Sequence, residues 1–343
     1  MVDRLASTVR HMPSGSFAFV MATGIVSTAF HTINQQSISN ILLSVAIIGL
    51  IILLGAIIVR LALYRGDIVL DVYEPSRAFG FFTIIAGINV VGIRLYSSNA
   101  PTLTILMALL ATPVWLILTY GIPGTLILRG RDVPVVSEVN GSWFLWVVAT
   151  QSLAAVAAVI GHDRATEFLG AAAVALWGIG VLLYLMLATL ITWRLLSRSN
   201  EPKTFSPSYW IYMGATAITV LAGARILALP KHLSVMQATT GFVSGFTYVL
   251  WAFGTWWVPL LVVFGFWRHI SKGEPAKYET GLWSIVFPLG MYSTASMLFG
   301  RQMKMPFITT IGHVGTWIAG VVWLTVTSLM VFRGSRWLNS HSD

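Results

Sequence analysis

The 343-residue sequence contains no cysteine and very few charged residues. Without cysteine, the chain can form no disulfide and no thiolate-ligated metal site. Charged residues make up only 10% of the chain and hydrophobic residues 56%, whereas soluble domains carry about 25% charged residues. A soluble fold of this length could not bury so much apolar surface. We therefore expect an all-α integral membrane protein.

Motifs for catalysis and metal binding are also missing. The sequence has no HExxH motif, no pair of acidic residues within an apolar segment, and no long loop that could cover a catalytic centre. Its histidines and carboxylates do not cluster at ligand spacing, so we expect no metal and no cofactor. The basic residues do not form one patch, which argues against a nucleic-acid partner. These absences argue against an enzyme, and no feature of the sequence favours a sensor.

Ten segments are long and apolar enough to cross a bilayer, which takes about 20 residues. They are residues 13–33, 38–64, 76–97, 101–128, 141–161, 165–195, 206–229, 234–269, 280–300 and 306–333. The first follows a basic start and resembles a signal peptide, but its apolar run is too long for one. We expect one transmembrane domain at 13–333, with a cytoplasmic N-terminal segment at 1–12 and a cytoplasmic C-terminal tail at 334–343.

The distribution of basic residues predicts the orientation. Of the 21 lysines and arginines, six fall in the connections on one side of the predicted bundle. These six are Arg94, Arg164, Arg225, Lys231, Arg301 and Lys304. The others fall on the side that carries both termini. Because cytoplasmic loops are enriched in Lys and Arg, both termini are expected in the cytoplasm of a cell-membrane protein.

The odd-numbered segments share a repeated beginning. It reads PSGSF at 13–17, PSRAF at 75–79, NGSW at 140–143, PSYW at 207–210 and TGLW at 280–283. Each even-numbered segment ends near an arginine: Arg60, Arg129, Arg194, Arg268 and Arg333. This order predicts five copies of a helical hairpin.

The two helices of each hairpin differ in side-chain size. Odd segments are rich in Gly, Ala, Ser and Thr, whereas even segments are longer and bulkier. Small residues allow close helix packing, and bulky apolar residues suit a lipid-facing helix. We therefore predict an inner ring of five odd helices around a central pore, surrounded by five even helices.

The repeat places five residues at one level of the inner ring: Met21, Thr83, Val147, Gly214 and Phe287. If this level faces the axis, Phe287 is a bulky constriction among smaller neighbours, and such a constriction can shut a pore. Pro288 would kink the ninth segment beside it. The spacing alone leaves the alternative that Phe287 packs in the protein core.

Uncharged polar residues and two arginines complete the predicted pore. The candidate lining residues are Thr23, Asn89, Gln151, Thr216 and Ser293, although each could instead bond within its own helix. Arg94 and Arg225 lie 15 positions after Phe79 and Trp210, at matching places in repeats two and four. They are predicted to attract anions at the outer mouth. Snorkelling to lipid headgroups is the alternative.

The stretches PSGSFAFVMATGIVS, SRAFGFFTIIAGINVVG and WSIVFPLGMYSTA, with the FP pair at Phe287 and Pro288, resemble the tellurite-resistance/dicarboxylate transporter family. The similarity runs from about residue 12 to residue 333 and is closest to the bacterial branch. It implies ten helices around a pore, a homotrimer, and a phenylalanine at position 287 that occludes the pore. It also implies small anion cargo, with C4-dicarboxylates such as malate or succinate favoured.

A coupled carrier or sulfite exporter of the same family is the main alternative. A proton-coupled carrier needs a titratable group near the middle of the membrane. His31 and His313 are the only histidines close to the predicted spans that could serve. A single histidine in a span is more often a hydrogen-bonded structural residue than a proton relay.

Overall fold

The computed structural model describes residues 2–130, 134–197, 206–273 and 278–339, with side chains described between residues 6 and 334 of these ranges. This part of the chain is helical and contains no strand. The helices are α1 (Val2–Arg10), α2 (Ala18–Thr32), α3 (Gln36–Leu63), α4 (Arg65–Tyr73), α5 (Pro75–Ala78), α6 (Phe82–Tyr96), α7 (Pro101–Leu128), α8 (Leu145–Arg164), α9 (Glu167–Ser197), α10 (Ile211–Leu227), α11 (Ser234–Phe266), α12 (Trp283–Gln302) and α13 (Pro306–Asn339).

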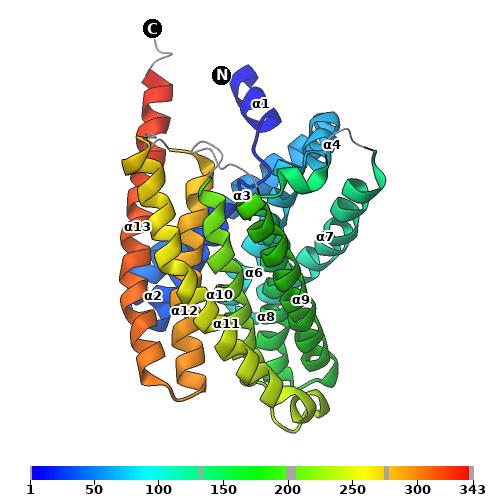
Figure 1. Cartoon of the computed structure of the whole chain (residues 1–343), viewed down its shortest axis with the longest axis vertical. Coiled ribbons are helices and arrows are strands. Elements are labelled where there is room, and N and C mark those ends of the chain that lie inside the picture. The colour runs from blue at the N-terminus through cyan, green and yellow to red at the C-terminus, as the bar shows by residue number, and fades with distance from the viewer. Residues whose placement is uncertain (1, 131–133, 198–205, 274–277, 340–343) are drawn as a thin grey trace.

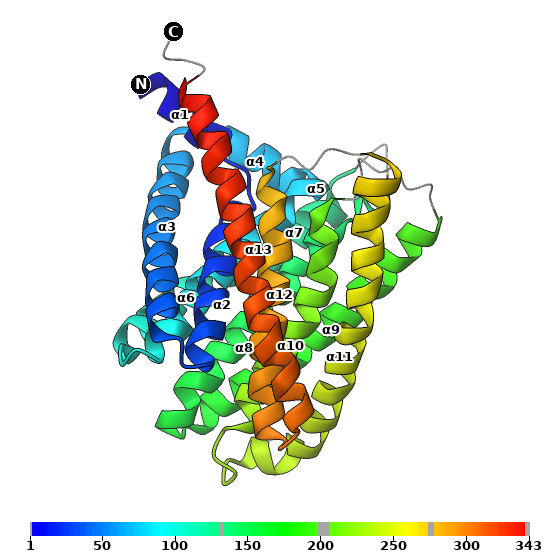
Figure 2. The same ribbon diagram turned by 90° about the vertical axis from the view of Figure 1, so that its left-hand side faces the viewer.

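The helices form an upright bundle in which both chain termini lie at one end (Figures 1 and 2). We refer to this end as the terminal end and to the opposite one as the far end. In the described part of the chain, nine helical stretches are long and apolar enough to cross a membrane. The tenth, α2, has only 15 residues, because residues 14–17 form turns instead of extending the helix as predicted.

Burial separates the helices into an inner and an outer set. In the four inner spans, between 72% and 94% of the most apolar stretch is buried; these spans are built on α6, α8, α10 and α12. In the outer helices, only 17% to 39% of that stretch is buried; these are α3, α7, α9, α11 and α13. The inner helices, α2 included, have 15 to 20 residues and the outer ones 28 to 34. Protein surrounds the inner helices, so they need not match the bilayer thickness.

The inner helices form a closed ring in the order α2, α6, α8, α10, α12 and back to α2, and each also packs on the outer helix that follows it in sequence. Glycines allow this approach. A Cβ on Gly290 of α12 would lie 3.0 Å from both Ile25 Cγ2 and Val26 Cγ2 of α2. The predicted five hairpins and inner ring are thereby confirmed.

The repeated sequence at the start of each inner helix forms a short lead-in turn at the terminal end. The 3-10 turns are η1 (Phe79–Phe81), η3 (Gly141–Phe144), η4 (Pro207–Trp210) and η6 (Thr280–Leu282); a further short turn, η2 (Val135–Glu138), precedes η3. Neighbouring lead-in turns touch: a Cβ on Gly141 would collide with the carbonyl of Ser208. The glycine at this position is thus required for the turns to close around the axis.

Indole groups of four outer helices bond to the next inner helix around the ring. Trp115 of α7 donates to Thr150 Oγ1 of α8, Trp177 of α9 to the Thr219 carbonyl of α10, Trp251 of α11 to Ser296 Oγ of α12, and Trp323 of α13 to Thr23 Oγ1 of α2, at 2.9–3.0 Å. Each of these four outer helices therefore joins its own repeat to the following one.

Candidate functional site

A small cavity lies on the axis of the inner ring. Its volume is about 10 Å³, which is room for roughly one water molecule. All five inner helices line it, through Ile25, Thr28, Val90, Ile93, Ser152, Ala155, Ile218, Leu221, Arg225 and Met291. The cavity therefore lies where the sequence predicts a central passage. At this size it is too narrow for an anion to pass.

Phe287 lies one helical turn before the cavity-lining Met291, on its terminal side. The phenyl ring is fully buried, and it rests beside Gly214, where a Cβ would be 3.5 Å from Phe287 Cδ1 and 2.8 Å from Pro288 Cγ. Met21, Thr83 and Val147, expected at the same level, are also fully buried. Pro288 lies inside α12, which continues through it without a break.

Arg225 is the single charged residue among those that line the axial cavity. Its Nε is buried and has no hydrogen-bond partner, and the residue forms no ion pair within the described part of the chain. A guanidinium in surroundings of low dielectric attracts an anion far more strongly than one in water. No carboxylate lines the cavity to neutralise it.

Arg94 does not share this arrangement, although the repeat predicts that it is equivalent to Arg225. Its guanidinium turns outward and donates to Ser39 Oγ at 2.9 and 3.1 Å, to Ser98 Oγ at 2.6 Å and to Asn40 Oδ1 at 3.2 Å. These bonds join α6 to the start of α3. The structure thus gives Arg94 a set of hydroxyl and amide partners, whereas Arg225 is left unpaired at the axis.

Most of the polar residues predicted to line the pore face the outer helices. Thr23 accepts the Trp323 indole N–H, and Gln151 Nε2 donates to the Trp177 carbonyl at 3.0 Å. Thr216 abuts Gly254 of α11, and Ser293 abuts Gly312 and Gly315 of α13. The remaining two polar residues bond elsewhere. Thr83 donates to the Gly80 carbonyl in its own lead-in turn. Asn89 donates to Ser152 Oγ, beside the axial cavity.

The cavity residues could have been found from a helical spacing that starts at the predicted level. Ile25, Ile218 and Met291 follow Met21, Gly214 and Phe287 by four positions, and Thr28, Val90 and Leu221 follow Met21, Thr83 and Gly214 by seven. Residues four and seven positions apart lie on one helix face. The residues that line the cavity therefore follow the predicted level at helical spacing, and most of them are apolar.

The two histidines considered for a proton relay lie away from the axis. His31 Nδ1 is hydrogen-bonded to Gln36 Oε1 at 2.9 Å at the far end. His313 is exposed on the outer helix α13 and lines a surface groove. Neither contributes to the axial cavity.

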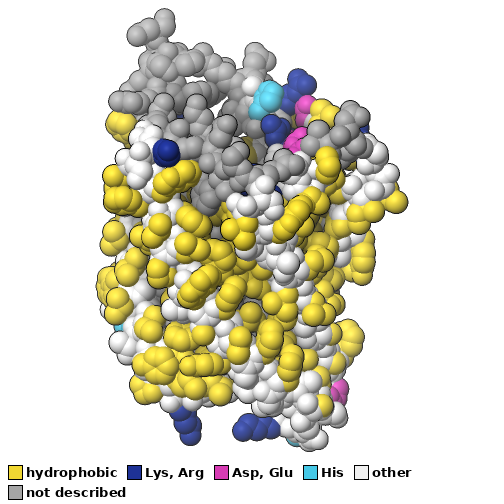
Figure 3. All heavy atoms as spheres, viewed as in Figure 1, with side chains coloured by type: hydrophobic (Ala, Val, Ile, Leu, Met, Phe, Trp, Pro, Cys, Tyr) yellow, Lys and Arg dark blue, Asp and Glu magenta, His cyan; other side chains and the backbone are white. Residues whose placement is uncertain are grey.

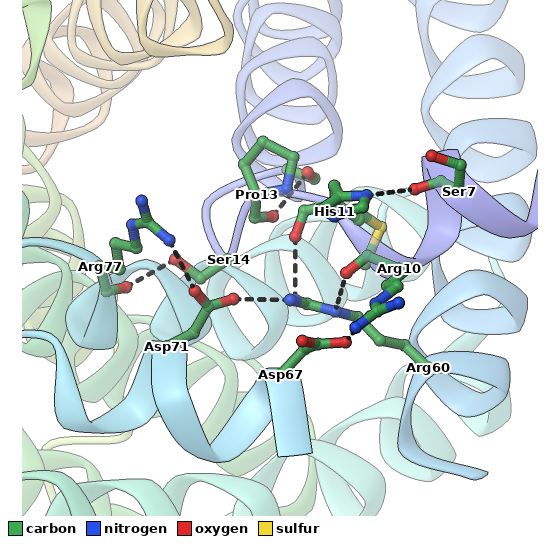
Figure 4. Close-up of polar contacts among 11 residues, drawn as sticks. Ser7, Arg10, His11, Pro13, Ser14, Arg60, Asp67, Asp71 and Arg77 are labelled. Atoms are coloured by element: carbon green, nitrogen blue, oxygen red, sulfur yellow. Dashed lines mark hydrogen bonds and ion pairs between the residues drawn. The ribbon is translucent and has the colours of Figure 1, made fainter. Parts of the chain in front are cut away.

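At the terminal end, a network of charges fixes the chain before the first inner helix (Figure 4). The buried Arg60, at the end of α3, donates to the carbonyls of Arg10 and Met12 at 3.0 and 2.9 Å and pairs with Asp71 at 2.7 Å. Arg10 in turn pairs with Asp67 at 2.8 Å, and this hydrogen bond raises the pKa of Arg10. The network surrounds a cavity of about 570 Å³.

The four other repeated arginines also contact the connections beside the lead-in turns. Arg129 lies over the Tyr73 ring at 4.2 Å, and Arg194 donates to Tyr209 Oη at 2.6 Å. Arg268 is 3.5 Å from the Glu279 carboxylate, and Arg333 donates to the Tyr278 carbonyl at 2.5 Å. The arginines found by their spacing therefore attach the ends of the outer helices to the segments that lead into the inner helices. Arg131, Arg198, Lys203 and Lys277, which fall on the same side by sequence, lie outside the described residues.

Comparison with known proteins gives matches over nearly the whole chain. The profile of the SLAC1 family, described as a voltage-dependent anion channel, matches residues 11–331. An uncharacterized membrane protein of Mycobacterium tuberculosis is 42% identical over 145 residues, which cover 42% of this chain and 73% of that protein. A sulfite efflux pump of Trichophyton rubrum is 20% identical over 347 residues, which cover 93% of this chain and 90% of the pump.

A further match is an uncharacterized transporter of Methanocaldococcus jannaschii, 22% identical over 148 residues, which cover 43% of this chain and 42% of that protein. The family profile spans all five hairpins and every residue of the axial cavity.

Proposed function

The chain belongs to the SLAC1 family of voltage-dependent anion channels, and from that premise we propose that anions cross through the centre of its inner ring, past Phe287 and Arg225. Family membership confirms the resemblance drawn from the sequence and identifies a multi-pass membrane protein that transports anions and is not an enzyme. The observation that carries the proposal is the axial cavity, which all five inner helices line and in which Arg225 is unpaired.

In this proposal, Phe287 is the gate. Its ring is buried one turn from the cavity and rests against Gly214, so movement of the ring or separation of α10 and α12 would widen the passage. Phe287→Ala should raise anion flux into liposomes strongly.

Phe299→Ala is the matched control for the gate, because Phe299 is an equally buried phenylalanine of α12 that lies eight residues beyond the cavity-lining Met291, near the end of the helix. Both variants lose the same volume, and removal of a buried phenyl ring costs about 3–5 kcal/mol. If the two variants leak equally, the increased flux reflects loosened packing and Phe287 is not the gate.

We propose that Arg225 attracts the permeating anion. In the Phe287→Ala background, Arg225→Gln should lower the anion-over-cation preference measured from reversal potentials, because it removes the one charge at the cavity. Arg94→Gln is the control, since Arg94 is bonded to α3. Equal reversal potentials with and without Arg225→Gln would contradict this role.

For the cargo we propose small anions, with C4-dicarboxylates such as malate or succinate first and sulfite second. The resemblance to dicarboxylate transporters supports the first, and similarity to sulfite efflux pumps over 93% of the chain supports the second. Uptake by proteoliposomes should be compared for malate, succinate, sulfite, nitrate and chloride under an imposed voltage. For chloride and nitrate, which stay fully ionised, passive transport predicts that an added pH gradient changes nothing beyond its effect on voltage.

We further propose a cell-membrane homotrimer with the terminal end in the cytoplasm and residues 13–333 as its pore domain. The family resemblance supports the trimer, and the excess of basic residues at the terminal end supports the orientation. Native mass spectrometry of the purified protein should show three copies of the 37.5 kDa chain.

A further inference from the structure

A groove lies at the far end of the molecule, where α12 turns into α13. Its volume is about 740 Å³, within the range of about 300–1,000 Å³ typical of ligand sites. Arg301, Lys304 and His313 line it together with apolar side chains that include Val314 and Trp317. No acidic residue is among its lining residues.

The basic groups of this groove have few protein partners. Arg301 donates one N–H to the Thr32 carbonyl at 3.0 Å, which leaves four of its five N–H donors. The side chains of Lys304 and His313 form no hydrogen bond or ion pair with any described residue. The groove therefore offers unpaired positive charge and hydrogen-bond donors to an anionic group.

The backbone at Lys304 is unusual for a lysine. Its φ is +54°, in the left-handed region, and the turn is a Schellman motif in which Met305 N bonds to the Gly300 carbonyl and Lys304 N to that of Arg301. The same pattern follows α2 and α6, where Asn34 and Asn99 occupy the left-handed position with φ of 63° and 60°.

Asparagine tolerates this conformation better than lysine. The left-handed position after the third inner helix α8 is occupied by Ala165, with φ of 48°, so residues other than asparagine also occur there. In the fifth repeat, this position places a lysine among the residues that line the groove.

The groove also has the polarity profile of a membrane interface. Lys304 lies in the turn, while His313 and Trp317 lie seven and eleven residues after the first residue of α13, or about 10 and 16 Å deeper along the helix. Headgroup regions are about 5–8 Å thick on each side of the hydrocarbon core. Trp317 is 50% exposed and packs edge-on against Phe30 with 5.3 Å between ring centroids, so it presents an apolar wall at acyl-chain depth.

We propose that this groove binds an anionic phospholipid, with the phosphate held by Arg301 and Lys304 and an acyl chain along His313, Val314 and Trp317. Figure 3 shows basic side chains at this end of the molecule, just beyond the apolar band. The site is separate from the axial cavity and does not depend on which anion the protein transports.

The test uses the purified full chain and titrates palmitoyl-oleoyl phosphatidylglycerol, followed by native mass spectrometry. Lys304→Asn removes the charge but keeps a residue suited to the turn, so the variant should fold normally. A lysine near a headgroup contributes about 1 kcal/mol, so the variant should bind the lipid about fivefold more weakly. Lys304→Arg should retain binding.

Two controls make the result decisive. Lys231→Asn removes an exposed lysine at the same end that does not line the groove, and it should leave lipid binding unchanged. Glycerol phosphate, which has no acyl chain, should compete poorly. Equal phosphatidylglycerol binding by Lys304→Asn and the unmodified chain would overturn the proposal. A changed number of subunits with unchanged lipid binding would overturn it too, because the groove would then be a contact between copies of the chain.

Discussion

At the scale of single residues, Gly214 shows how closely the inner helices α10 and α12 approach each other beside Phe287. A side chain at this position would lie 2.8 Å from Pro288 Cγ and 3.3 Å from Pro288 Cβ, and a proline ring cannot rotate away. Gly214→Ala should therefore lower stability by about 1–3 kcal/mol, the usual cost of overpacking. Thermal unfolding in detergent would measure the change.

The control for this prediction is Gly178→Ala on the outer helix α9, because no atom lies within 4 Å of the added Cβ. That variant should be at least as stable as the unmodified chain, since alanine favours a helix over glycine by about 1 kcal/mol. Equal destabilisation of both variants would show that the contact with Pro288 is not the cause.

The same scale shows where sequence reasoning reached its limit. Phe287 and Gly214 were placed at one level by the repeat, and the structure brings them into contact. The direction of Thr23 and Gln151 could not be predicted, because every face of an inner helix is buried and no polar pattern marks the axis. Only knowledge of their partners on α13 and α9 resolves it.

At the scale of helices, α13 is joined to α2 by the bond from Trp323 to Thr23 Oγ1, at 3.0 Å. Trp323→Phe keeps an aromatic ring and removes the donor, so it should lower stability by about 1 kcal/mol. Trp193→Phe is the control, since Trp193 is 58% exposed on α9.

A double-mutant cycle with Thr23→Val separates this bond from the lost ring contacts. The bond predicts that the double variant is less destabilised than the sum of the single ones. Full additivity would mean that Trp323 and Thr23 stabilise the bundle independently.

Helix α1 depends on a different contact, the buried Arg60. Arg60→Met would leave Asp71 with Arg77 alone at 3.2 Å and remove the donors to the carbonyls of Arg10 and Met12. Breaking a buried pair by removing one partner costs about 3–5 kcal/mol. We expect lower thermal stability and faster proteolysis of the N-terminal segment. Arg65→Met should change neither, because the exposed Arg65 bonds only within its own turn.

The helices themselves were largely predictable, and the exceptions have local causes. The outer segments are long apolar runs, and residues 101–128 coincide with α7. The first inner helix begins at Ala18 instead of residue 13, because Pro13 and Gly15 favour a turn. Helix α4 was not predicted: its nine residues are too few for a span, and it lies between two of them.

At the scale of the whole molecule, the absence of cysteine allows a direct test of orientation. Ser76 is exposed at the terminal end and His232 at the far end. In intact cells, a membrane-impermeant maleimide should label the variant His232→Cys and should leave Ser76→Cys unlabelled until the cells are opened. The reverse pattern would place the terminal end outside the cell. Because the unmodified chain has no thiol to react, any signal comes from the introduced residue.

The contact between α13 and α2, which joins the last repeat to the first, also has a consequence for biosynthesis. Trp323 and Thr23 are 300 positions apart, and ribosomes add about 5–20 residues each second. The first hairpin is therefore synthesised about 15–60 s before α13, the last helix that packs against it. During that interval the polar flank of α2 has no native partner, so temporary shielding by lipid, by the insertion machinery or by a chaperone would protect the nascent chain from degradation.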